Sequence, residues 1–318
     1  MYQGIVISSS VMKSYKIDCP HCGKHSLYVT PANGLSYCFV CKYVHKEVDS
    51  ETSGGRTQRV EKQRSAYIDE IRVFYAQLTH YYHSALGIEQ RKYLYQRGYT
   101  DETITTQKIG YAPYGTHPWY KTQIAREAGI ATHTHESFLQ GRITFPYFKT
   151  QQHITDIRAR ALDPNAAIKY LSPYHSVFYR GAVYPYHYQY HTAEQKRILI
   201  TEGEIKADIA TQHGYLTLGL PGIGSWRTGM IPLDTIQYII IFDTESDPTT
   251  QAYVVRAIHA VAQQLPNAQN IYVAALPYSA GKKAEIDIFL LETPQLFHSI
   301  IENAIRYTDW KKLVRRYA

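Results

Sequence analysis

The chain has 318 residues, a formal net charge of +7 and 44% apolar residues, as expected for a globular protein of two or three domains. Its longest strongly apolar run, Tyr238 to Phe242, is far shorter than the roughly 18 residues that a membrane helix needs. The amino terminus has no sustained apolar stretch followed by a cleavage site, so we expect no secretory signal. Composition therefore excludes a helical membrane protein and favours the reducing cytoplasm.

The charge is unevenly distributed along the chain. Residues 1–64, 65–194 and 296–318 are each net basic, whereas residues 195–295 carry seven basic and ten acidic side chains. Basic surfaces attract a polyanion such as a nucleic acid. A local excess of acid indicates either carboxylates gathered around divalent cations or a solvated acidic face, and charge alone does not choose between them.

All four cysteines lie in one short stretch, as two CxxC pairs: Cys19, Cys22, Cys38 and Cys41. This spacing is typical of a zinc ribbon, because each pair offers two thiolates from one tight turn and two turns close a tetrahedron around Zn²⁺. A disulfide pair, a redox CxxC, or His21 or His25 in place of one cysteine are the alternatives. We therefore predict a structural zinc site in a β ribbon over residues 1–47.

Alternating residues in Ser26 to Thr30 and Leu35 to Phe39 predict a hairpin within this ribbon. Residues 48–64 are polar and charged, which predicts a flexible linker. Apolar residues then recur at helical spacing and predict a helix over about 65–86.

A mixed α+β subdomain is predicted over residues 65–194. Residues 88–112 read as helix, turn, helix and short strand, and further strands are expected at 142–147, 154–162 and 167–171.

Strands and helices then alternate over residues 195–295. The strands are expected at 198–201, 236–242 and 271–275, and the helices at 205–212 and 249–264. This alternation predicts a parallel sheet with flanking helices. Residues 296–318 are predicted to form a helical tail, too short for a helicase motor.

Acidic side chains follow these predicted strands. They are Glu202 after the first strand, Asp243 and Glu245 after the second, and Glu285 and Asp287 beyond the third. The carboxyl ends of parallel strands meet at one edge of a sheet, where carboxylates repel one another unless cations neutralise them. Taken singly, a carboxylate in such a place is more often a solvated loop residue or a helix cap. Taken together, oxygen ligands of this kind suit Mg²⁺ or Mn²⁺, so we expect a catalytic metal site.

Residues 198–290 resemble a Toprim domain, the catalytic module shared by bacterial DnaG-type primases, topoisomerases and some nucleases. The acidic motif positions of that family fall on Glu202 in LITEG, Asp243 and Glu245 in IIIFDTE, and Glu285 and Asp287 in KKAEIDIFL. Upstream, RKYLYQRGYTDETITTQKIGYAP (91–113), GRITFPYF (141–148), IRARAL (157–162) and KYLSPYHSVFYRG (169–181) follow the order of primase blocks. Topoisomerases and Toprim nucleases lack this upstream part, so the chain is most similar to a DnaG-type or phage primase.

The upstream blocks contain four basic residues that the resemblance implies for nucleotide or template binding: Arg142, Arg158, Arg160 and Lys169. Cationic side chains next to an acidic module are what a triphosphate or template phosphate requires. Surface charges on exposed strands are the alternative.

Three features depart from the family pattern. Glu245 stands where an aspartate is usual, and Lys206 stands where DnaG-type primases usually place another aspartate. Lys206 at this catalytic position could contact phosphate instead of supporting a metal, which puts a second metal site in doubt. The ribbon has four cysteines, as in phage primase-helicases.

The resemblance implies an α/β multi-domain protein with an amino-terminal β zinc ribbon, a mixed α+β basic subdomain and a Rossmann-like Toprim sheet. It further implies a DNA primase of phage or plasmid type that uses Mg²⁺ or Mn²⁺, single-stranded DNA and nucleoside triphosphates. We expect a separate replicative helicase, and a location in the cytoplasm of a bacterial cell or phage-infected host. A Toprim nuclease or nicking enzyme, and a catalytically idle DNA-binding protein, are the alternatives.

Overall fold

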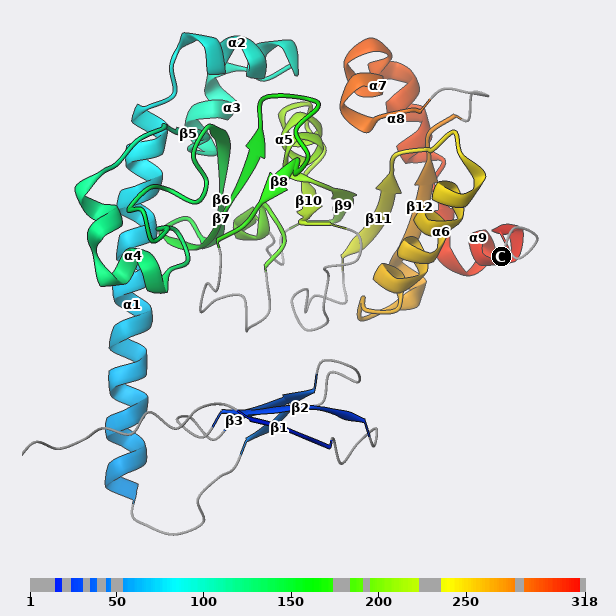
Figure 1. Cartoon of the computed structure of the whole chain (residues 1–318). Helices are drawn as coiled ribbons and strands as arrows, with labels where there is room; N and C mark the ends of the chain where they lie inside the picture. The colour runs from blue at the N-terminus through cyan, green and yellow to red at the C-terminus, as the bar shows by residue number, and fades with distance from the viewer. Residues whose placement is uncertain are drawn as a thin grey trace, which may run out of the picture. The chain divides into compact units, whose positions relative to one another are not determined.

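The computed structural model of the chain describes residues 15–18, 24–30, 35–38, 44–46, 54–173, 184–190, 195–222, 236–277 and 283–314. The chain divides into two compact units, Met1–Ser65 and Ala66–Ala318 (Figure 1). Within the described ranges, no helix combines the length and the apolar character needed to cross a membrane.

The first unit contains a four-stranded antiparallel sheet in the order β1-β2-β3-β4. Its strands are β1 (Tyr15–Asp18), β2 (His25–Thr30), β3 (Leu35–Cys38) and β4 (Val44–Lys46). The predicted hairpin is confirmed, because Thr30 pairs with Leu35 across β2 and β3. Cys19, Cys22 and Cys41 lie outside the described residues, as does the side chain of Cys38, so the zinc site stays a prediction.

One continuous helix, α1 (Gly54–Ser84), joins the two units. The predicted flexible linker over 48–64 is therefore wrong from Gly54 onward; residues 48–53 lie outside the described part of the chain. Residues 56–64 carry Arg, Gln, Glu and Lys, which favour helix without forming an apolar face, and apolar periodicity detects only helices that bury one. Such a face follows in the second half of α1, where the buried side chains are Ile71, Phe74, Tyr75, Leu78 and Tyr82.

An antiparallel sheet in the order β5-β6-β7-β8 forms the first half of the second unit. Its strands are β5 (Gly110–Ala112), β6 (Arg142–Thr150), β7 (His153–Ala161) and β8 (Tyr170–Leu171). The helices α2 (Ile88–Gln96), α3 (Asp101–Thr106) and α4 (Gln123–Glu127) and the 3-10 turn η1 (Pro118–Lys121) surround it. The predicted order of helix, turn, helix and strand is thus confirmed.

A mostly parallel sheet in the order β10-β9-β11-β12-β13 forms the second half of this unit. Its parallel strands are β9 (Arg197–Glu202), β10 (Thr217–Leu220), β11 (Gln237–Phe242) and β12 (Ile271–Ala275), and β13 (Ile305–Arg306) runs antiparallel to β12. The predicted parallel sheet and its three strands are confirmed. Sequence patterns missed the short β10 and β13.

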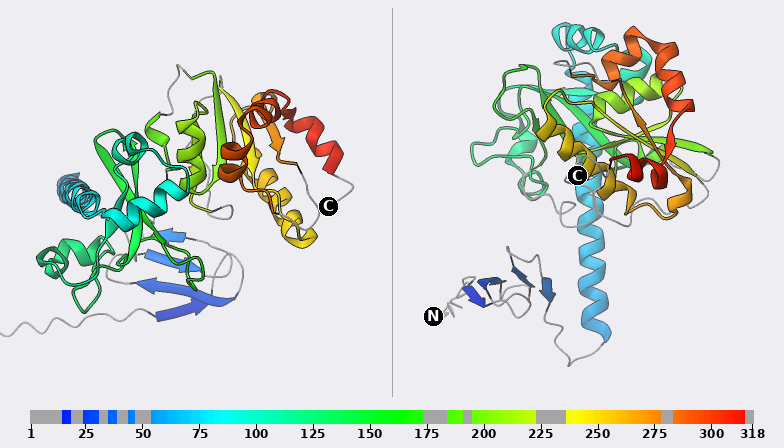
Figure 2. Two further views of the ribbon diagram at one scale, coloured as in Figure 1. Left: turned by 90° about the horizontal axis from the view of Figure 1, so that it is seen from above. Right: turned by 90° about the vertical axis from the view of Figure 1, so that its right-hand side faces the viewer.

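Helices cover both faces of the parallel sheet (Figure 2). They are α5 (Glu204–Gln212), α7 (Ile286–Glu292) and α8 (Pro294–Glu302) on one face, and α6 (Pro248–Ala262) and α9 (Tyr307–Val314) on the other. Side chains alternate between the faces, since Leu199 packs with α5 and α7 while its neighbours Ile198 and Ile200 pack with α6 and α9.

Residues 294–314 complete this sheet instead of forming a separate tail. Strand β13 pairs with β12, and Tyr307 and Trp310 of α9 are buried against the sheet. Residues 294–314 therefore belong to the body predicted to end at residue 295. On the opposite face, Ile143, Phe145 and Tyr147 of β6 join the same apolar cluster as Leu199, so the two sheets share one core.

Candidate active site

The predicted carboxylates lie at the carboxyl ends of the parallel strands. Glu202 is the last residue of β9, and Asp243 directly follows β11. Asp287 lies in the first turn of α7, just after Glu285. Two backbone hydrogen bonds between Thr244 and Ala284, each 3.0 Å, hold the segments after β11 and before α7 together.

Asp243 lies at the centre of the cluster and is 7% exposed. Its Oδ1 accepts a hydrogen bond of 3.2 Å from the backbone N–H of Ile286. Its Oδ2 lies 2.8 Å from Nζ of Lys206 and 3.3 Å from Nζ of Lys283. Both carboxylate oxygens of Asp243 are therefore already occupied by donors.

Lys283 connects the carboxylates that surround Asp243. Its Nζ lies 2.9 Å from Glu245 and 3.7 Å from Glu285, in addition to its contact with Asp243. Burial lowers the pKa of Lys283, but the hydrogen bond to Glu245 and the nearby carboxylates outweigh burial and raise the pKa above its usual value. The lysine is thus held as a cation.

Arg97, at the carboxyl end of α2, forms an ion pair with Asp287 and lies 3.9 Å from Glu285. Asp287 is 1% exposed, and its Oδ1 has no hydrogen-bond partner. Burial raises the pKa of Asp287, while Arg97 and Lys206 act in the opposite direction. One buried oxygen of Asp287 is therefore left without a donor or cation.

Glu202 differs from the other carboxylates because its side chain makes no hydrogen bond or ion pair with the described residues. Burial raises the pKa of Glu202, which Lys206 partly offsets. Gly203 follows with φ of 86°, a backbone conformation that side chains rarely tolerate, and α5 begins at the next residue. This turn places Glu202 and Lys206 on the same side of the sheet.

A small pocket of about 50 Å³ brings the acidic and basic residues together. Its lining includes Glu202, Lys206 and Glu285 from the parallel half, and Arg160 and Lys169 from the antiparallel half. The guanidinium of Arg160 donates to the hydroxyls of Tyr93 at 2.8 Å and Tyr170 at 2.6 Å, which fix its orientation. The pocket thus has fixed cationic groups beside an unpaired carboxylate.

Arg142 and Arg158 do not line this pocket. Arg142 donates to the backbone carbonyls of Ile168 at 2.9 Å and Lys169 at 3.2 Å, so it holds the segment that carries Lys169. Arg158 lies 2.8 Å from the fully buried Glu204, which also accepts a hydrogen bond from Tyr147. This buried ion pair joins β7 of the antiparallel half to α5 of the parallel half.

Sequence patterns missed three of the residues that line the pocket with polar or charged side chains. They are Arg97, Tyr170 and Lys283. Arg97 lies in the block that carries the primase resemblance, and Lys283 lies two residues before Glu285. These two positions are the weak indications that the sequence gives of a place in the site. A single basic residue at a helix end or in a loop has no periodic pattern, which is why it was not recognised.

The carboxylates fit a hard divalent cation by their chemistry, and the unpartnered Oδ1 of Asp287 is one observation in favour of such a ligand. They do not converge on one point, since no three Asp, Glu, His or Cys side chains in the described part of the chain form a group able to hold a metal. Lys206 and Lys283 lie between them instead. A metal would bind here only with movement of a lysine.

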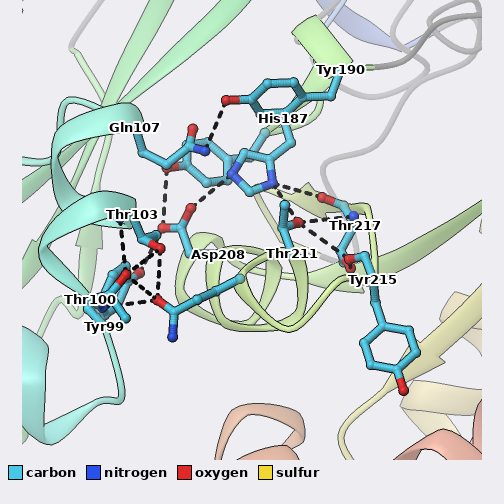
Figure 3. A network of polar contacts seen from close by, with 12 residues as sticks. Tyr99, Thr100, Thr103, Gln107, His187, Tyr190, Asp208, Thr211, Tyr215 and Thr217 are labelled. Carbon is cyan, nitrogen blue, oxygen red and sulfur yellow. Dashed lines mark hydrogen bonds and ion pairs between the residues drawn. The ribbon is translucent and has the colours of Figure 1, made fainter.

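A polar network behind α5 fixes this helix (Figure 3). Asp208 is fully buried and accepts hydrogen bonds from Tyr99 at 2.7 Å and Tyr186 at 3.3 Å. Nε2 of His187 lies 2.8 Å from Asp208 Oδ1, and its Nδ1 lies 3.0 Å from the carbonyl of Thr217. Both ring nitrogens of His187 thus lie within hydrogen-bond distance of acceptor oxygens.

His187 has φ of 68°, a left-handed conformation that costs free energy for a residue with a side chain. The network therefore stabilises a strained backbone against β10 and α5. A groove of about 680 Å³ on this side of α5 is lined mostly by threonine and glutamine side chains, and Asp208 is also part of its lining. Its described lining contains no basic side chain, so it does not suit a phosphate.

This arrangement of two sheets is similar to solved primase catalytic cores. A DnaG primase catalytic domain bound to single-stranded DNA is 18% identical, covers 77% of this chain and 83% of its own, and gives a TM-score of 0.59. The Aquifex aeolicus primase, with zinc-binding and RNA polymerase domains, is 14% identical, covers 92% of this chain and 79% of its own, and gives 0.53. The second unit of the chain thus shares a mixed α/β fold with solved DnaG primase catalytic cores.

Comparisons of the sequence give two matches to DNA primases. Residues 75–193 match the family model of the DNA primase catalytic core, N-terminal domain. A curated DNA primase of Staphylococcus epidermidis (strain ATCC 12228 / FDA PCI 1200) is 27% identical over 221 residues, which are 60% of this chain and 36% of the relative. The predicted resemblance to DnaG-type primases is confirmed, although the chain spans about a third of the length of this relative.

The carboxyl-terminal half has a different match. Residues 187–294 match the family model of a domain of unknown function, DUF3854. This segment contains the parallel sheet and every predicted acidic ligand. Its assignment as a Toprim domain therefore stays a prediction.

Proposed function

We propose that the chain is a DNA primase that copies single-stranded DNA into short RNA primers by metal-dependent nucleotidyl transfer, in replication of phage or plasmid type. The pocket that holds Glu202 and Glu285 opposite Arg160 and Lys169 carries the proposal. It combines carboxylates suited to a divalent cation with cationic groups suited to a triphosphate. Such a pairing is what phosphoryl transfer requires, since catalysis there is mostly positioning and charge stabilisation.

Each side chain of the pocket has a role in this proposal. Two tyrosine hydroxyls engage Nε and Nη1 of Arg160, which leaves its Nη2 for a phosphate oxygen of the nucleotide. Lys169, whose pKa is lowered by burial and by Arg160, lies beside it as a second phosphate contact. Glu202, Glu245 and Asp287 are the donors for Mg²⁺ or Mn²⁺, which when bound would stabilise charge on the reacting phosphate.

The remaining partners follow from the same proposal. Single-stranded DNA is the template, and the solved DnaG core bound to single-stranded DNA supports this choice. The four cysteines of the amino-terminal unit bind one structural Zn²⁺, as the zinc-binding domain of the Aquifex aeolicus primase suggests. A separate replicative helicase supplies the unwound strand, and the work takes place in the cytoplasm with the replicating DNA.

Substitution of Glu202 by glutamine tests the proposal. Because Glu202 has no partner among the described residues, Glu202→Gln should leave the fold and the unfolding temperature unchanged. Synthesis of primers from labelled nucleotides on single-stranded DNA should fall by about 100-fold or more, since metal-stabilised charge contributes several kcal/mol to such a transition state. DNA binding should change little, because phosphate contacts come from basic side chains.

Glu292→Gln, at the exposed end of α7, is the matched control and should keep full activity. Near wild-type primer synthesis by Glu202→Gln would refute the assignment of this site. Shortening of the DNA by the wild-type chain, with no nucleotide incorporation, would instead identify a nuclease that uses the same carboxylates.

A further inference from the structure

The groove behind α5 is separate from the pocket at the strand ends. Its volume of about 680 Å³ lies within the range of small-ligand sites, and among the described residues none lines both cavities. The groove is formed by α3 and the residues beside it, by α5, by the 3-10 turn η3 (Tyr188–Tyr190) and by the turn between β6 and β7. These segments belong to both halves of the second unit, so a ligand in the groove would contact both.

Uncharged polar side chains dominate the lining of this groove. Among the described residues it has four threonines and five glutamines, together with Tyr190, Leu216 and the carboxylates of Glu102 and Asp208. Two carboxylates without a basic side chain in the described lining repel an anion. Threonine hydroxyls and glutamine amides both donate and accept hydrogen bonds, so the lining suits an uncharged ligand with donors and acceptors of its own.

Gln107 has hydrogen-bonding capacity that the fold leaves unused. The residue is 5% exposed, and its Nε2 donates to the hydroxyl of Tyr190 at 3.1 Å (Figure 3). Its Oε1 is buried and has no hydrogen-bond partner in the described part of the chain. Because a primary amide has two N–H donors and a carbonyl oxygen, one donor and the acceptor remain for a ligand. A buried polar atom without a partner is costly, and a ligand that supplies the partner removes that cost.

Gln189 provides a second unpaired acceptor, because its Oε1 is also buried and has no partner among the described residues. Gln212 on α5 shows the contrast. Its Oε1 accepts from the hydroxyl of Thr103 at 2.7 Å, and its Nε2 donates to the carbonyl of Gly98 at 2.9 Å. Gln212 therefore joins α5 to the α3 region, whereas Gln107 and Gln189 keep amide oxygens for a ligand.

The amide of Gln107 matches a ligand edge that has a donor and an acceptor side by side. Either orientation of the amide leaves such a pair beside the bond to Tyr190, since the oxygen has two lone pairs and the nitrogen two hydrogens. Nucleobases have edges of this kind. Glutamine pairs with adenine through two hydrogen bonds, to N6 and N7.

Two further features of the lining favour a free nucleoside. The ring of Tyr190 suits a flat ligand, because bases stack on aromatic side chains, and a sugar alone has no flat ring. A base within a DNA strand would bring a phosphate towards Glu102 and Asp208, which repel it. An uncharged nucleoside has the flat base without the phosphate.

We propose that the groove binds an uncharged nucleoside, with an adenine base paired to the amide of Gln107. Oε1 of Gln189 accepts a further hydrogen bond from the ligand, and the exposed side chains of Thr106 and Gln151 are available to the ribose hydroxyls. This site is independent of the primer synthesis proposed above and needs no metal ion. Because the ligand contacts α3 and α5 together, its binding should stabilise the folded chain.

Calorimetric titration of the full chain with adenosine, in the presence of a chelator, tests this. One adenosine should bind per chain and raise the unfolding temperature. Inosine, which has a carbonyl oxygen in place of the N6 amino group, should bind about tenfold more weakly, because Oε1 of Gln107 loses its donor. Gln107→Met keeps the length of the side chain without the amide and should weaken adenosine binding by about tenfold. Gln152→Met, at an exposed glutamine outside the lining, is the matched control and should equal wild type.

The opposite results are equally definite. Absence of adenosine binding, equal affinities for adenosine and inosine, or unchanged affinity in a folded Gln107→Met would overturn the proposal. If Gln107→Met does not fold, unchanged affinity in Gln189→Met does the same. Displacement of adenosine by pyrophosphate would place the nucleoside in the cationic pocket, and displacement by a single-stranded oligodeoxyadenylate or by maltose would assign the groove to a strand or a sugar; each contradicts the proposal. None of these results bears on primer synthesis, which Glu202→Gln tests.

Discussion

Asp156 in β7 is a buried carboxylate without a compensating cation in direct contact. It is 5% exposed, and its Oδ1 accepts a hydrogen bond of 2.8 Å from the backbone N–H of Ile157. Burial raises its pKa to about 7, which that hydrogen bond and Arg158 only partly oppose. Near neutral pH, the folded chain therefore either binds a proton at Asp156 or holds a costly buried charge.

This residue makes stability depend on pH. The pKa of Asp156 is higher in the folded than in the unfolded chain, so its favourable contribution is complete below about pH 4 and is lost as pH rises to about 7. Asp156→Asn should remove this dependence and be more stable than wild type at pH 8 by a few kcal/mol, on the order of 1.4 per pKa unit. Chemical denaturation of both proteins at pH 5 and pH 8 measures this difference in the free energy of unfolding. The exposed Glu102→Gln is the control, and equal pH profiles for Asp156→Asn and wild type would refute the prediction.

At the scale of single residues, sequence patterns predict the position of a site residue when that residue directly follows a predicted strand. Glu202 and Asp243 were found because they end parallel strands, and such ends meet at one edge of a sheet. Arg97 and Lys283 were not found, because their contacts join segments far apart in the chain.

Among the elements, α5 depends on a buried polar network instead of an apolar face alone. Asp208 and His187 are both fully buried, and Asp208→Asn would remove the charge that the imidazole and two tyrosine hydroxyls face. We expect a loss of roughly 3 kcal/mol in the free energy of unfolding, as for one partner removed from a buried pair. His213→Ala, at the end of the same helix, should cost much less. A double-mutant cycle with His187→Ala measures the coupling, and a coupling near zero would contradict this view.

Helices and strands could be predicted from the sequence where they are long enough and have a clear apolar pattern. Strands β9, β11 and β12 are runs of β-branched residues, and all three were predicted. Strand β13 has two residues and exists because β12 offers it an edge, which no local pattern reveals. The first part of α1 was missed for the opposite reason, since its residues favour helix but show no apolar stripe.

At the scale of the whole molecule, the order of strands and helices predicted a mixed fold, and the solved DnaG cores agree with it. The shared core of the two sheets was not predictable. Tyr147 of β6 lies in the same cluster as Leu199 of β9, and Arg158 of β7 pairs with Glu204 of α5. Such contacts unite segments about fifty residues apart and depend on three-dimensional packing, so a boundary placed near residue 195 divides what is one body.

The division into two units predicts that the second folds without the first. The boundary falls between Ser65 and Ala66, and the first buried residue among the described side chains of α1 is Ile71. Deletion of residues 1–65 therefore removes no described part of the core, and the shortened chain should unfold in one cooperative transition within a few degrees of the full chain's main transition. It should also lose all bound zinc, since every cysteine is removed. In primer assays it should extend an annealed primer but start few new ones.

Calorimetry, metal analysis and gel assays measure the three results. An insoluble or non-cooperative product would contradict the two-unit division, and unchanged initiation would contradict a template role for the amino-terminal unit.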